Sequence, residues 1–184
     1  TTGGVCEKNA HPHEYNGFYV VHNGIVENYK ELKEDLIKKG HKFISDTDTE
    51  VIAHLVSEEF KDSLEDAVRK ALKKIVGSYG VAIVSPKDKD KIVIAKMSSP
   101  IIIGICKDGH IVASDPSAVI DYTKQIVTLD DGEIAVLKKD GYMILKEKKI
   151  EIIDWESDAV SKGEYEHFML KEIMEEPNVI ENAT

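Results

Sequence analysis

Three stretches in the first half of the chain carry apolar residues at the spacing of an amphipathic helix. We expect these helices to begin at Asn28, Thr47 and about Ser63, with Gly40 and Gly77 as stop signals after the first and the third. Asn28 and Thr47 each stand three residues before a glutamate, which is the spacing of a capping box. Both side chains are therefore predicted to cap their helices.

Beyond the helices the pattern changes to short runs of β-branched and aromatic residues, separated by turn signals such as Asp131-Gly132. A run of the same character precedes the helices, and Asn23-Gly24 is expected to end or bend that strand. A short helix is expected after Asp115-Pro116. Strands grouped beside a block of helices indicate an α+β fold, not alternating βαβ units. The expected strands are residues 17–22, 79–84, 91–96, 101–106, 111–114, 125–129, 133–137, 142–145 and 150–153.

Two segments fit neither pattern. Residues 1–16 have no helical or strand period and are predicted to be a long loop, which is typical of a functional segment or of a missing partner. Residues 161–184 are rich in glutamate and have no place in the strand pattern. We therefore expect the main domain to span residues 1–160, with residues 161–184 as a linker or the start of another domain.

The chain is acidic, with 24 Lys and Arg against 34 Asp and Glu. Since phosphate contacts need clustered basic side chains, we expect no nucleic-acid partner. No apolar run approaches the roughly 20 residues of a membrane helix and no export signal opens the sequence, so we expect no membrane partner and a cytoplasmic location. The two cysteines, Cys6 and Cys106, are predicted to be free. Arg69 is the single arginine, so a bidentate clamp on a substrate carboxylate must use it or come from elsewhere.

His22-Asn23-Gly24, at the end of a predicted strand, is the first candidate for chemistry. A side-chain amide beside a glycine amide offers two adjacent hydrogen-bond donors, and glycine has no Cβ to block a close approach. Two converging donors are what stabilises the oxyanion in acyl transfer. The same pair is also the commonest hairpin turn, so a purely structural role is the alternative.

Asp48, within Thr47-Asp48-Thr49-Glu50, is the second candidate. An acid in the first turn of a helix suits the helix dipole, which is a structural explanation. The functional interpretation is a carboxylate presented at a helix start to bind a cationic group such as an α-ammonium.

Three further candidates have weaker signals. His11 and His13 could bind a metal, but no further ligand stands at a recognisable spacing, which favours hydrogen bonding within the loop. Cys6 has no neighbouring base to mark it as a thiolate. Thr1 could act as a nucleophile activated by its own α-amine, as in threonine-type hydrolases.

Several strings of the sequence are specific when taken together: NAHPH at residues 9–13, VVHNGIVENYKEL at 20–32 and SDTDTEVIAHLV at 45–56. SSPIIIG at 98–104, IVASDPSA at 111–118 and YEHFMLKEIMEEP at 165–177 follow in order. The chain thus resembles, over nearly its whole length, the glutaminase domains of the glutamine–fructose-6-phosphate aminotransferase family, which are class II glutamine amidotransferases. Amidophosphoribosyltransferases share the Asn-Gly pair but usually lack the NAHPH and TDTEVIAHL motifs.

The resemblance implies an N-terminal-nucleophile (Ntn) hydrolase fold, a four-layer αββα sandwich, with no metal and no cofactor. In that family a cysteine at the mature N-terminus attacks the glutamine side-chain amide and releases ammonia. A C-terminal isomerase domain then uses the ammonia to convert fructose 6-phosphate to glucosamine 6-phosphate. The family also implies a homodimer, formed largely through the isomerase part.

Carried over by position, the resemblance gives roles to six residues. Asn23, through its side chain, and Gly24, through its backbone amide, match the oxyanion hole. Asp48 matches the carboxylate that binds the α-amine of glutamine, and Thr1 matches a threonine of the glutamine-binding loop. His11 and His22 match supporting positions near the site.

The chain also departs from the family pattern, and these departures set further expectations. The segment that carries the catalytic cysteine and the first strands precedes the part matched here, as does the arginine that grips the substrate carboxylate. Thr2 stands where the family has histidine. We therefore expect the 184-residue chain by itself to be inactive as a glutaminase. The alternatives are an amidophosphoribosyltransferase-type glutaminase and a module that binds glutamine without turnover.

Overall fold

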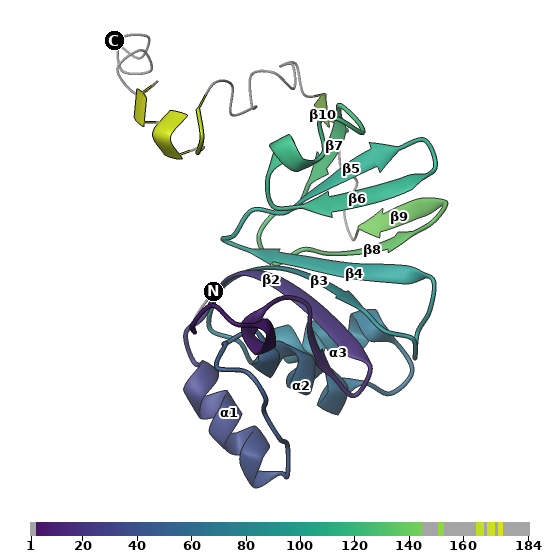
Figure 1. Cartoon of the computed structure of the whole chain (residues 1–184). Helices are drawn as coiled ribbons and strands as arrows, with labels where there is room; N and C mark the ends of the chain where they lie inside the picture. The colour runs from purple at the N-terminus through teal and green to yellow at the C-terminus, as the bar shows by residue number, and fades with distance from the viewer. Residues whose placement is uncertain (1–2, 145–150, 153–164, 168, 172, 175–184) are drawn as a thin grey trace.

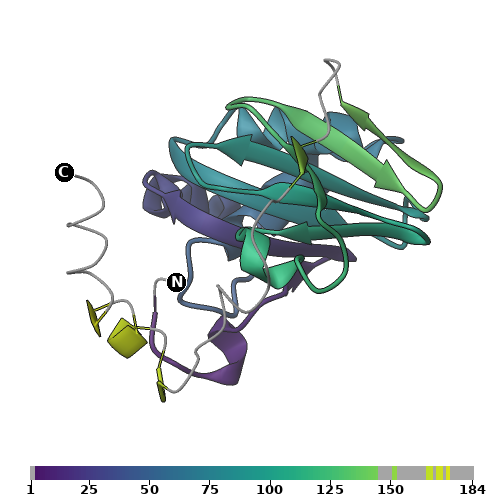
Figure 2. The same cartoon turned by 90° about the horizontal axis from the view of Figure 1, so that it is seen from above.

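The computed structural model describes residues 3–144, 151–152, 165–167, 169–171 and 173–174, and they form stacked layers of helices and sheets (Figure 1). Three helices, α1 (Tyr29–Lys38), α2 (Glu50–Glu59) and α3 (Leu64–Leu72), lie on one side of a six-stranded sheet. A four-stranded sheet lies on the other side, and Figure 2 shows the two sheets overlying each other when seen from above. This arrangement confirms the expected α+β class.

The six-stranded sheet is antiparallel throughout, in the order β1-β2-β3-β4-β8-β9. Its strands β2 and β3 pair over eight residues, which places Asn23 opposite Gly80 and His22 opposite Val81. The bounds are β1 His13–Tyr15, β2 Phe18–Val26, β3 Gly77–Val84, β4 Lys91–Met97, β8 Ile134–Lys138 and β9 Gly141–Ile144.

The four-stranded sheet has the order β10-β7-β5-β6, with β5 Ile102–Cys106, β6 Gly109–Ala113, β7 Gln125–Thr128 and β10 Glu151–Ile152. Alternate residues of β5 and β7 face opposite ways, as strand geometry requires. Ile103 and Val127 pack in the core between the sheets, whereas Ile102 and Ile126 pack with Val119, just after the short 3₁₀ helix η2 (Pro116–Ala118). In the described part of the chain this short segment is what covers the outer face of the second sheet.

The main core lies between α2, α3 and the six-stranded sheet. Every residue of α2 from Glu50 to Val56 is buried, because the helix is enclosed by the sheet and by its neighbouring helices. Buried side chains alternate along β2, so that one face of this strand packs on the helices and the other faces away from them. The inward residues of the strand are Phe18, Val20, His22 and Val26.

The predicted helix starts are confirmed in position at α1 and α3, but the capping predicted at Asn28 and Thr47 is wrong. Ser63, near which the third helix was expected to begin, does cap α3, although no cap was predicted there: its side chain accepts a hydrogen bond from the Asp66 amide. The Asn28 side chain instead bonds the backbone of residues 74 and 76, tying α1 to the segment after α3. Helix α2 begins at Glu50, so Thr47 lies before it and its hydroxyl bonds other side chains.

Two other expectations are corrected. The Asn23-Gly24 pair neither ends nor turns the chain, because β2 continues through it to Val26 and stays paired with β3. Residues 1–16 are not all loop, since they contain the 3₁₀ turn η1 (Glu7–Asn9) and strand β1. The other predicted strands are confirmed to within two residues at the ends that the structure describes. The predicted boundary at residue 160 and most of residues 161–184 lie outside the described residues.

None of the helices in the described segments is long and apolar enough to span a bilayer.

Candidate functional site

A cavity of about 530 Å³ opens where the end of β2, the start of α2 and the edge of the second sheet meet. It draws residues from six parts of the chain that are separated in sequence. One side is polar, formed by the loop before β1, by β2 and by the entry to α2. The rest of the wall is built from small and apolar residues. The lining residues are His11, Val21, His22, Asn23, Gly24, Asp48, Thr49, Gly80, Ala82, Pro100, Ile101, Val112, Ala113, Ser114 and Ala118.

Strand β2 presents two functional candidates to this cavity, Asn23 and Gly24. The Asn23 side chain is exposed on the face away from the helices, one residue after the buried His22. Gly24 follows with φ +132, a backbone conformation that side chains disfavour. A Cβ at this position would lie 2.2 Å from the Ser78 carbonyl oxygen and 2.9 Å from the Ser99 hydroxyl. The glycine therefore allows β3 and the segment after β4 to approach β2 closely beside Asn23.

We expect Gly24→Ala to lower the free energy of unfolding by about 3 kcal/mol, because it adds backbone strain to a steric clash. Gly141→Ala is the matched control, since nothing lies within 4 Å of a Cβ built there. Urea denaturation of both variants measures the difference. Equal stability of the two variants would contradict this description of the Gly24 environment.

Asp48 is buried in the wall of the cavity, with 2% of its surface exposed. Its Oδ2 accepts a hydrogen bond of 2.8 Å from the backbone amide of Val26, near the end of β2. Asp48 precedes the N-cap residue Thr49, so it stands just before α2 and not in its first turn. The carboxylate thus fastens the entry of α2 to the strand that carries Asn23 and Gly24.

Thr49 joins two histidines of the cavity wall. Its hydroxyl lies 3.0 Å from Nδ1 of His22 and 3.4 Å from Nε2 of His11. The other ring nitrogen of His22, Nε2, lies 3.3 Å from the carbonyl oxygen of Ser78 on β3. Partial removal from water lowers the pKa of the more exposed His11, and burial lowers that of His22, below the ordinary value, which favours the neutral rings.

The loop of residues 44–48, which delivers Asp48, is held by Glu50 from its own helix. The Glu50 carboxylate accepts hydrogen bonds from the amides of Ile44 and Ser45, at 2.8 and 2.7 Å, and from the Ser45 hydroxyl at 2.7 Å. Burial alone would raise the pKa of Glu50, but the nearby His54, the Ser45 hydroxyl and the two amides lower it to about 2. Glu50 is therefore a buried anion at neutral pH, and it fixes the backbone of this loop.

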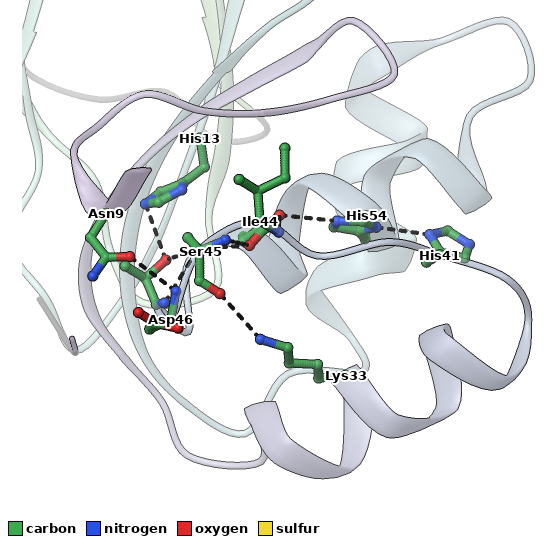
Figure 3. A network of polar contacts seen from close by, with 10 residues as sticks. Asn9, His13, Lys33, His41, Ile44, Ser45, Asp46 and His54 are labelled. Carbon is green, nitrogen blue, oxygen red and sulfur yellow. Dashed lines mark hydrogen bonds and ion pairs between the residues drawn. The ribbon is translucent and has the colours of Figure 1, made fainter. Parts of the chain in front are cut away.

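Further contacts hold the same loop from both sides (Figure 3). On one side Asn9 accepts a hydrogen bond from the Asp46 amide, and His13 Nε2 lies 3.1 Å from the Thr47 hydroxyl. On the other side His54 is stacked between the rings of Tyr15 and Phe43, with Nε2 3.6 Å from Glu50. The loop that carries Asp48 is thus fixed by a largely buried polar network, which extends through His54 Nδ1 to His41.

Comparisons with known proteins identify the family of the chain. A sequence model of the glutamine amidotransferase domain family matches residues 6–121. The chain belongs to this family.

The chain is similar over its full length to enzymes named glutamine–fructose-6-phosphate aminotransferase [isomerizing]. It is 46% identical to the one from Thermotoga maritima over 191 residues, and 47% identical to the one from Thermococcus kodakarensis over 194 residues. Each alignment covers 100% of this chain and 32% of the relative. The chain therefore spans about a third of the length of these relatives.

Solved structures show the same fold. The glutamine phosphoribosylpyrophosphate amidotransferase of B. subtilis, complexed with ADP and GMP, superposes with a TM-score of 0.65 at 25% identity. The match covers 76% of this chain and 32% of that one. A glutamine aminotransferase class-II domain protein from Silicibacter pomeroyi gives a TM-score of 0.54 at 16% identity and shares the fold. The expected Ntn-hydrolase fold of the class II amidotransferases is thereby confirmed.

The structure brings five of the six predicted site residues into one cavity: His11, His22, Asn23, Gly24 and Asp48. The sixth, Thr1, and its neighbour Thr2 lie outside the described residues. Sequence reasoning missed Thr49 as a cavity residue and Glu50 as the anchor of the loop. Both stand in the polar run SDTDTE, six residues of which only Asp46 is exposed, and such burial is the sign of a polar network.

The other candidates lie elsewhere or have structural partners. Within the described residues no group of three or more potential metal ligands occurs, and His11 and His13 each contact a threonine hydroxyl. Cys6 and Cys106 are both free, and neither lines the cavity. Arg69 pairs with Asp66 on the same helix and is likewise absent from the cavity wall.

Proposed function

We propose that this chain is the glutaminase part of an enzyme that takes the amide nitrogen of glutamine and delivers it to fructose 6-phosphate. The observation that carries the proposal is the single cavity shared by Asn23, Gly24 and Asp48. Its volume, about 530 Å³, lies in the range of small-molecule sites. The names and high identity of the full-chain relatives support the choice of acceptor.

In this proposal Asp48 binds the α-ammonium of glutamine, and the side chain of the substrate extends toward Asn23 and Gly24. A thiolate attacks the carboxamide carbon, and the carbonyl oxygen becomes an oxyanion. The Asn23 side-chain amide and the Gly24 backbone amide donate hydrogen bonds to that oxyanion. Collapse of the tetrahedral intermediate expels the nitrogen, which leaves as ammonia after gaining a proton, and water then hydrolyses the thioester to glutamate.

The remaining roles are proposed from the family resemblance. By the family resemblance, the thiolate belongs to a cysteine at the mature N-terminus. Cys6 and Cys106 do not line the cavity. Thr1 contributes to the glutamine-binding loop. We also propose that the protein acts in the cytoplasm as a homodimer, with fructose 6-phosphate bound by an isomerase domain.

Asp48→Asn tests the proposed binding of the α-ammonium. In the protein at its natural length, we expect the KM for glutamine to rise about 10- to 100-fold, the size of a lost charge-assisted hydrogen bond. The kcat should change little, because the asparagine oxygen can still accept from the Val26 amide. Asp35→Asn, at an exposed ion pair, is the control and should leave the KM unchanged. An unaltered KM in Asp48→Asn would refute this role.

The second candidate is an amidophosphoribosyltransferase-type glutaminase, which the solved B. subtilis structure supports at 25% identity. The two functions differ in acceptor. We expect fructose 6-phosphate, and not phosphoribosyl pyrophosphate, to accelerate the consumption of glutamine by the protein at its natural length. Acceleration by phosphoribosyl pyrophosphate alone would instead favour the second candidate. Saturable glutamine binding without ammonia release would favour a binding module.

A further inference from the structure

The hydroxyl of Thr49 is not used in the way usual for its position. Thr49 is the N-cap residue of α2, and N-cap hydroxyls commonly accept a hydrogen bond from a backbone amide of the first turn. Here the backbone of Thr49 is helical, with φ −63 and ψ −36, and its side chain makes no capping bond. The hydroxyl instead lies between His22 of β2 and His11 of the loop before β1. It therefore links the three elements that form the polar side of the cavity.

The partners of this hydroxyl define the direction of each hydrogen bond. A carbonyl oxygen can only accept, so His22 Nε2 carries the hydrogen that it donates to Ser78. The neutral His22 ring then has a lone pair on Nδ1, which accepts from the Thr49 hydroxyl. Since a hydroxyl has a single hydrogen, Thr49 can only accept from His11. His11 must therefore donate through Nε2, which leaves Nδ1 as the acceptor of its ring.

We propose that Thr49 is a positioning residue of the glutamine site, which fixes the tautomer and the orientation of His11 at the cavity wall. The chain Ser78–His22–Thr49–His11 fixes His11 as an Nε2–H tautomer with an Nδ1 acceptor for an N–H group of the bound amino acid. His11 itself is exposed and lies on a loop, so it needs such a contact to keep one orientation. The inference rests on the proposed function, because the ligand that it names is glutamine.

Two substitutions of Thr49 distinguish the effect of its hydroxyl from the effect of its side-chain shape. Thr49→Val keeps the branched shape and removes the hydroxyl, whereas Thr49→Ser keeps the hydroxyl. Long-range ¹H–¹⁵N spectra of the histidine rings report which nitrogen carries the hydrogen. In the wild-type chain we expect His11 and His22 both to be Nε2–H tautomers. In Thr49→Val, His22 should keep its tautomer through Ser78, and His11 should become a mixture. Thr49→Ser should restore the wild-type spectrum.

The kinetic readout uses the protein at its natural length. We expect Thr49→Val to lower kcat/KM for glutamine about tenfold, the effect of one lost hydrogen bond, and Thr49→Ser to retain most of the activity. A wild-type His11 in the Nδ1–H form, or a Thr49→Val protein with an unchanged His11 tautomer and unchanged kcat/KM, would overturn the inference and leave the proposed function standing. If the wild-type protein releases no ammonia from glutamine, the proposed function fails, and the inference fails with it.

Discussion

Asn23→Ala is expected to slow the release of ammonia from glutamine about 100- to 1,000-fold, the usual loss when one oxyanion donor is removed. The loss should fall on kcat, because the side-chain amide stabilises charge that exists only after the nucleophile has attacked. Asn23 is exposed on the outer face of β2, so the fold should keep its stability. Steady-state kinetics of the protein at its natural length, together with a melting curve, measure both quantities.

Asn23→Asp and Asn16→Gly sharpen this test. Asn23→Asp keeps the size of the side chain but replaces the amide donor with an acceptor, so it should be at least as slow as Asn23→Ala. Asn16→Gly removes a carboxamide that does not line the cavity, at a backbone φ of 51 that glycine adopts readily, and it should retain wild-type kcat. If Asn23→Asp keeps wild-type kcat, Asn23 does not serve as an oxyanion donor.

Glu50→Gln is expected to lower the free energy of unfolding by about 3–5 kcal/mol, the cost of disrupting a buried, fully hydrogen-bonded carboxylate. Its amide group would place a donor against the amides of residues 44 and 45 or against the Ser45 hydroxyl, all of which are donors to Glu50 in the native structure. Because the loop of residues 44–48 carries Asp48, the KM for glutamine should rise as well. Denaturant unfolding and glutamine kinetics measure the two effects.

The same carboxylate predicts how stability depends on pH. The folded-state pKa of Glu50 is lowered from 4.5 to about 2, so the unfolded chain binds this proton more tightly than the folded chain. The resulting stabilisation, about 3 kcal/mol, is fully present above pH 4.5 and is lost as the pH falls through about 2. In Glu50→Gln the loss of stability between pH 4.5 and about 2 should become smaller. Glu31→Gln, which changes an exposed residue, should keep the wild-type dependence on pH. If the stability of wild type and of Glu50→Gln changes with pH in the same way, Glu50 is not the source of this pH dependence.

The strands were predictable because their signals are local. Each run of β-branched and aromatic residues is bounded by a turn signal, and alternation shows which face is buried, as in the series from Phe18 to Val26. The exception is Asn23-Gly24, whose preference for turns is overridden by eight paired residues of β3. At this position the pairing with β3 outweighs the local preference for a turn. That pairing cannot be predicted from the sequence of β2 alone.

The helix caps were harder to predict because their side chains have distant partners. Asn28 bonds residues 74 and 76, and Thr47 bonds His13, so both are diverted from the amides that a capping box would use. Such contacts depend on how segments far apart in sequence meet. Ser63, which lies at the start of an exposed turn, has no such distant partner among the described residues, and its side chain is free to cap α3.

The residues that line the cavity could be predicted where their own functional group suggests a chemistry, and they were missed where a structural role explains the residue equally well. Asn23, Gly24 and Asp48 were identified by functional groups that suit an amide substrate, and they share one cavity. Thr49 and Glu50 have side chains that a helix start explains equally well. Their roles became apparent only when the structure placed His11, His22 and the loop of residues 44–48 around them.

The most direct test of the proposed site is a crystal structure of the protein at its natural length with L-glutamate, which keeps the α-ammonium of glutamine and a side-chain carbonyl. We predict that the α-ammonium lies within hydrogen-bonding distance of the Asp48 carboxylate, and that a side-chain oxygen lies between Asn23 Nδ2 and the Gly24 amide. Glutamate bound outside this cavity, or bound in it with the opposite orientation, would contradict the proposed site.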